Sequence, residues 1–147
     1  MWIDERGSEV LPLAECRRLL ALAAKRRHHG HLGFPTDDAP VVLPLDFSVH
    51  GSDVVLQLGD GLFAHVVGRL VAFQVDHTAA APDDDSEGRW SVLVRGLALE
   101  GDPESNGHDL PEPRVAEPGL RIVHVRADVV TGRRIHGSHA SSGGTER

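Results

Sequence analysis

The sequence predicts a mainly β protein, a small antiparallel β-barrel of six strands that carries two helices. Val is abundant and Tyr is absent, so aliphatic and β-branched side chains that suit a pleated surface must build the core. Apolar and polar residues alternate in several short runs, and Gly, Pro and Asp separate these runs. A length of 147 residues suits one domain with a core of its own.

A helix is predicted over residues 11–29, because apolar residues recur there at helical spacing. Pro12 suits the first helical position, where its missing N–H is no loss, and Gly30 is predicted to end the helix. A second, short helix is predicted over 62–67. The apolar face of the first helix consists of Leu13, Cys16, Leu20 and Ala23.

Six short runs have the composition and alternation of strands. They cover 31–34, 40–48, 53–58, 69–76, 89–100 and 120–135, the last with a turn at 131–132. Pro44 cannot donate a ladder hydrogen bond, which predicts an edge strand or a bulge. The run 89–100 is apolar on both faces, which predicts cover on both sides, as a closed or dimeric barrel provides.

Composition excludes several classes of protein. The net charge of −7 leaves no basic stripe for a nucleic acid. The chain has one cysteine and no apolar run of membrane-spanning length, which predicts a soluble cytoplasmic protein. We expect one domain over residues 1–135 and a disordered tail rich in Ser, Gly and His over 136–147.

Six segments, in their order and spacing, resemble the split-barrel flavoproteins related to pyridoxamine 5'-phosphate oxidase, a group that includes nitroimidazole-reductase-like proteins. The resemblance implies a six-stranded antiparallel split β-barrel that forms a homodimer, with two pockets for flavin mononucleotide (FMN) at the subunit interface. The segments that carry it are 13–20, 31–34, 41–47, 71–76, 90–96 and 130–134.

The resemblance also implies positions for the flavin. The flavin ring would lie on the backbone of Pro44, Leu45 and Asp46, and Trp90 and Ser91 would flank the ring or the phosphate. The interpretation of Trp90 as a pocket wall competes equally with a role in sealing the barrel or the dimer interface.

The positions that would hold the flavin phosphate are altered. An Arg-Thr pair and a Lys are usual in the family. Here Gln57 and Leu58 stand at the positions of the pair, and Phe63 or its neighbour stands at the position of the Lys. His65 and Arg69 are the basic residues near this point. The loss of two cations removes charge-assisted hydrogen bonds that a dianionic phosphate requires.

Arg95 lies inside a strand among apolar neighbours and has two interpretations. It is a further possible anion contact, although pairing with Asp76 or another carboxylate is favoured about two to one. Cys16, on the apolar helix face, is interpreted as a packing residue and not as a nucleophile.

Two functions therefore compete. The first is an FMN-dependent oxidoreductase that acts on a small molecule, for which no catalytic acid or base of the protein is obligatory. The second is a non-catalytic barrel that holds a deazaflavin, haem, a small anion or no ligand. His65 and His124 are possible haem ligands, whereas adjacent histidines at 28, 29 and 31 diverge and favour no metal site.

Overall fold

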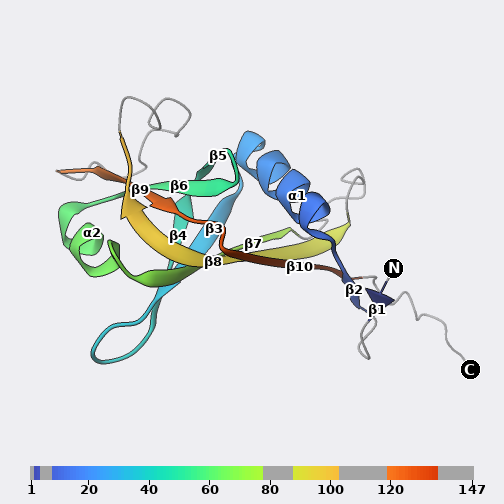
Figure 1. Ribbon diagram of the computed structural model, residues 1–147, viewed down its shortest axis with the longest axis horizontal. Helices are drawn as coiled ribbons and strands as arrows, with labels where there is room; N and C mark the ends of the chain where they lie inside the picture. The colour runs from blue at the N-terminus through green and yellow to red at the C-terminus, as the bar shows by residue number, and fades with distance from the viewer. Residues whose placement is uncertain (1, 4–7, 78–87, 103–118, 136–147) are drawn as a thin grey trace, which may run out of the picture.

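The computed structural model describes residues 2–3, 8–77, 88–102 and 119–135. Within these ranges the chain forms two helices and a curled antiparallel sheet of ten strands (Figure 1). The helices are α1 (Leu13–Lys25) and α2 (Asp60–Val66). The strands are β1 (Trp2–Ile3), β2 (Ser8–Val10), β3 (His29–Phe34), β4 (Val41–Asp46), β5 (Ser48–His50), β6 (Asp53–Leu58), β7 (Leu70–His77), β8 (Arg89–Glu100), β9 (Arg121–Val125) and β10 (Val129–Ile135).

The sheet has a main path and a branch. The main path runs β1-β2-β10-β8-β7-β3-β4, and the branch β5-β6-β9 joins it at the far end of β8. No backbone pairing joins β4 to β6 within the described strands, so the curled sheet is split at that point. The predicted split β-barrel fold class is confirmed.

Strand β8 belongs to both parts of the sheet. It pairs with β7 as far as Leu97 and with β10 as far as Arg95, and from Ala98 onward it pairs with β9. At the change of partner the backbone carbonyl of Arg126 lies so close to Gly96 that a Cβ there would be 1.8 Å from the carbonyl oxygen. Only glycine allows the link between β9 and β10 to pass at this distance.

The inner face of the main sheet packs on the core, and its outer face is turned away from it. Val71, Phe73 and Val75 of β7 are buried and their neighbours are not, as the alternation predicts. The β3 backbone also packs directly on the core, since a Cβ on Gly30 would be 2.4 Å from the Phe73 ring. Trp90, Val92 and Val94 of β8 complete this inner face.

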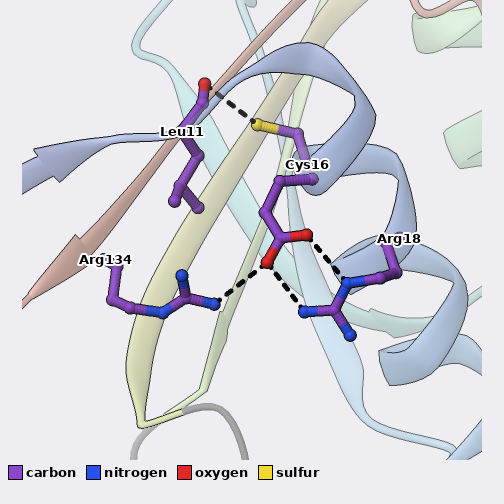
Figure 2. A network of polar contacts seen from close by, with 5 residues as sticks. Leu11, Cys16, Arg18 and Arg134 are labelled. Atoms are coloured by element: carbon purple, nitrogen blue, oxygen red, sulfur yellow. Dashed lines mark hydrogen bonds and ion pairs between the residues drawn. The ribbon is translucent and has the colours of Figure 1, made fainter. Parts of the chain in front are cut away.

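Helix α1 covers the inner face beside β10 (Figure 1). Cys16 is fully buried against Gly132, where a Cβ would be 2.6 Å from the Cys16 Sγ. Figure 2 shows the polar contacts of the same region. Arg18 donates two hydrogen bonds to Glu15 at 2.7 and 2.8 Å, and Arg134 of β10 donates one at 3.3 Å, which ties the helix to the sheet.

The predicted count of six strands is wrong in four places, one of which is the added two-residue strand β1 on β2. The run 40–48 is interrupted at Phe47, where the buried ring turns the chain from β4 into β5. The run 120–135 breaks at 126–128, where the chain crosses Gly96, and not at 131–132, which pair with β8 inside β10. Residues 8–10 form an additional strand that pairs with β10. This strand was not predicted because it contains few apolar residues.

The helix predicted over 11–29 is shorter. It ends at Lys25, and Arg27 adopts a left-handed conformation with φ of 59°. Gly30 is therefore not the helix stop but part of β3. Leu13 is 46% exposed, and Leu19 takes its place on the buried face. The short helix lies over 60–66, close to the predicted 62–67.

Parts of the predicted organisation lie outside the described residues. These are most of the acidic loop at 78–88, most of the loop at 101–119, and the tail from residue 136.

A methyl group at Gly96 is expected to destabilise the fold strongly. Gly96→Ala would force the Arg126 carbonyl away from β8, and overpacking against backbone costs about 3 kcal/mol. Chemical denaturation measures the free energy of unfolding. Gly61→Ala is the control, because Gly61 lies in α2 with no atom near its Cβ position and should gain about 1 kcal/mol. Equal stability of the two variants would contradict this account of the bend.

Glu15 should make the free energy of unfolding depend on pH in the acid range. Hydrogen bonds from Arg18, and then Arg134, lower its pKa from 4.5 to about 2. A carboxyl whose pKa falls on folding stabilises the protein above its unfolded pKa and loses this contribution as the pH falls from 4.5 toward 2. Glu15→Gln should therefore cost about 1 kcal/mol at neutral pH, discounted for partial exposure, and almost nothing at the acid end.

Thermal melts across that pH range measure the effect. Asp38→Asn, which removes an exposed carboxylate on the β3–β4 turn, is the matched control. A constant difference between wild type and Glu15→Gln at every pH would contradict the assignment.

Candidate functional site

The outer face of the main sheet carries several of the predicted site residues. On β4, Pro44 is exposed and Asp46 is partly buried, whereas Leu45 packs against the core. The register sets Pro44 beside His31, and Asp46 beside His29. The side chains of Pro44 and Leu45 therefore point to opposite faces, and only the backbone of this segment could meet one ligand throughout.

The second edge of β4 is open. Among the described strands β4 pairs only with β3, so the prediction of an edge position for Pro44 is confirmed. An edge strand presents backbone N–H and C=O groups in a row, and these can bond the polar rim of a flat heterocycle. This geometry fits a ring held by backbone.

The predicted phosphate positions on β6 and α2 are mostly apolar and packed. Leu58 and Phe63 are 1% and 8% exposed and belong to the core, while Gln57 is partly buried. His65 is exposed on α2. Leu58 and Phe63 thus offer no polar group to a phosphate, and Gln57 offers a neutral amide.

The structure adds a residue that the sequence did not single out. The Arg121 guanidinium lies 4.2 Å from the centre of the Phe63 ring, at the barrel end where α2 meets β9 (Figure 1). It donates to Glu100 at 2.8 Å and lies 3.6 Å from Asp60, so two carboxylates compensate its charge. The sequence did contain a signal for this residue, because Arg121 alternates with Val123 and Val125 and therefore shares an apolar strand face with them.

Trp90 and Ser91 point to opposite faces of β8. Trp90 is 3% exposed and lies in the core, with its ring 6.0 Å from that of His77. Ser91 is on the outer face, where Gln74 donates a hydrogen bond to its Oγ at 3.0 Å and another to Asp76 at 3.1 Å. Of these two residues of one subunit, Ser91 is the one presented to a ligand or a neighbouring subunit.

The favoured pairing of Arg95 with Asp76 does not form. The register sets Arg95 opposite Ala72 and sets Asp76 opposite Ser91. These two residue pairs are four positions apart along the strands, so the side chains of Arg95 and Asp76 do not meet. Arg95 is exposed and forms no hydrogen bond or ion pair with any residue that the structure describes.

A largely apolar groove of about 540 Å³ lies beside Arg95. Of the ten predicted site residues it includes Arg95 alone. Its lining residues are Gly33, Phe34, Pro35, Pro40, Val41, Val42, Leu70, Val71, Ala72, Arg95, Gly96, Asp128 and Val129.

The histidines and the cysteine form no metal centre in the described ranges, where no group of three ligating side chains converges. His124 Nδ1 lies 3.7 Å from Asp53, and its Nε2 is buried with no hydrogen bond. The packing role of Cys16 is confirmed by its full burial, which also raises the pKa of its thiol.

The split curled sheet, the helix on its inner face and the open β4 edge define a split β-barrel. A sequence profile described as pyridoxamine 5'-phosphate oxidase matches residues 12–132. The chain therefore belongs to the pyridoxamine 5'-phosphate oxidase family.

Solved structures agree with this assignment. An FAD binding protein from Mycobacterium smegmatis is similar with a TM-score of 0.65 and 25% identity over 87% of this chain and 100% of that one. A putative pyridoxamine 5'-phosphate oxidase from Corynebacterium glutamicum gives 0.68 and 20%, over 86% and 96%. An FAD and heme binding protein from Mycobacterium smegmatis gives 0.61 and 16%, over 87% and 74%.

No curated protein sequence matches this chain. Neither helix in the described ranges has the length and apolar character needed to cross a membrane.

Proposed function

We propose that this protein binds a flavin nucleotide, with FMN as the first choice, and acts as a flavin-dependent oxidoreductase on a small molecule. The observation that carries the proposal is the open edge of β4 at Pro44, Leu45 and Asp46, in a chain that belongs to this family. Two proteins of similar structure are an FAD binding protein and an FAD and heme binding protein, which supports a flavin and makes FAD the next ligand to test.

In this proposal the flavin supplies hydride chemistry, and the protein supplies orientation and exclusion of water. Backbone groups of β4 hold the polar rim of the ring. The outer face contributes Asp46 from the same strand and Ser91 from β8.

The phosphate end fits less well than the ring. Leu58 and Phe63 are core residues, and Arg121 is already compensated by Glu100 and Asp60. His65 and Arg69 are exposed and unpaired within the described ranges, so they are the cations that could reach a phosphate. We therefore expect binding dominated by the ring, with a small preference for FMN over riboflavin.

A homodimer is part of the proposal. The open edge of β4 favours cover by a second subunit. Because Trp90 is buried in its own core, Ser91 is the residue of this pair that would reach the ring of the neighbouring subunit. A single, buried cysteine fits a cytoplasmic location.

A second function is favoured by the burial of Leu58 and Phe63. A barrel that no longer needs a phosphate site could hold a deazaflavin, haem or a small anion without catalysis. His65, exposed on α2, is the more accessible of the two possible haem ligands.

Calorimetric titration of the purified protein with riboflavin, FMN, FAD, a deazaflavin and haem separates the two functions. The first predicts saturable binding of a flavin and a yellow protein. Binding of haem or deazaflavin alone would replace it with the second.

A gain of phosphate binding is expected from Gln57→Arg. Gln57 is the one altered position that is not packed in the core, so an arginine there can regain a charge-assisted bond worth about 1.5 kcal/mol. The ratio of riboflavin to FMN dissociation constants should rise about tenfold. Gln57→Leu, similar in size and uncharged, is the control, and an equal ratio in both variants would show that the phosphate lies elsewhere.

A further inference from the structure

The groove beside Arg95 has a small-residue floor and apolar walls. Gly33, Ala72 and Arg95 occupy one row across β3, β7 and β8, with Val42 and Val129 at its two ends. Gly33 has no side chain and Ala72 has a small one, so the middle of the row is low and forms the floor of the groove. Val42, Leu70 and Val129 beside it are 63%, 71% and 45% exposed, which leaves apolar surface available to a ligand.

One uncompensated charge borders this apolar surface. Arg95 forms no ion pair in the described ranges, whereas the Asp128 carboxylate in the lining is held by Arg126 at 3.2 Å. The Arg126–Asp128 pair is neutral as a unit, so the groove presents a net positive charge at Arg95. A planar guanidinium forms two parallel hydrogen bonds with a carboxylate or a similar anion.

From these features we infer that the groove binds a small organic anion with an apolar body, and that Arg95 pairs with its anionic group. The volume of about 540 Å³ lies in the range of small-molecule sites. Val42, in the groove, shares the outer face of β4 with Pro44 and Asp46, so the free end of the ligand reaches the strand that carries the proposed flavin ring. The inference names a substrate class and rests on the proposed function for that orientation alone.

Two fluorescent probes with similar bodies test the site. Anilinonaphthalene sulfonate carries the anion, and N-phenylnaphthylamine lacks it. Arg95→Gln should weaken the sulfonate about tenfold and leave the neutral probe unchanged. Arg17→Gln removes the same charge from the exposed face of α1 and should change neither affinity.

A second variant tests the groove itself. Gly33→Val places a side chain on the groove floor, where a Cβ meets nothing closer than 3.9 Å, so the strand should tolerate it. Both probes should bind about tenfold more weakly at an unchanged melting temperature. Naphthoate should displace the sulfonate from the wild type, and its amide should not.

Three outcomes overturn the inference. They are equal loss of both probes in Arg95→Gln, no loss in Gly33→Val, and a shift from dimer to monomer in Gly33→Val. The last result, seen by sedimentation, would make a second subunit the occupant of the groove. Probe binding is measured without flavin, so failure to bind flavin would overturn the proposed function and leave this site standing.

Discussion

The architecture depends on one strand that serves two parts of the sheet. Strand β8 pairs with β7 and β10 over its first part and with β9 over its last residues, and Gly96 marks the change. The carbonyl of Arg126 crosses the strand there at a distance that no side chain would permit. Because the link between β9 and β10 passes at this point, the branch β5-β6-β9 can fold over the core while β10 remains beside β8.

Different contacts close the two ends of the core. At one end α1 packs Cys16 on Gly132, and Glu15 bonds Arg134. At the other end α2 places Phe63 under Arg121, whose charge two carboxylates compensate. In both arrangements the polar groups hold a helix to a strand and are therefore not available to a ligand. The outer face of the main sheet and the edge of β4 are left to meet ligands or a second subunit.

Local patterns predicted most strands, because alternation and turn residues act within a few positions. The alternation of β7, the edge position of Pro44 and the packing role of Cys16 were confirmed on this basis. The chain breaks at Phe47 and 126–128 were missed, since each depends on what another strand does nearby. Arg121 and the lack of an Arg95–Asp76 pair depend in the same way on the register between strands that are distant in sequence.

The structure also explains why the three positions predicted to hold a flavin phosphate are not equally free to change. A lysine at Phe63 would put an ammonium group in the core beneath the Arg121 guanidinium, where desolvation and like-charge repulsion both oppose it. Leu58 is equally enclosed, so a polar residue there would need a partner that the core does not offer. These two positions are therefore tied to core packing, and Gln57 alone can change its charge without that cost. Arg121 is committed to Glu100 and Asp60, whereas Arg95 retains its charge beside apolar surface. Of these two arginines, Arg95 thus offers the available positive charge, on the outer face of β8, and recognition of an anion there needs no change in the core.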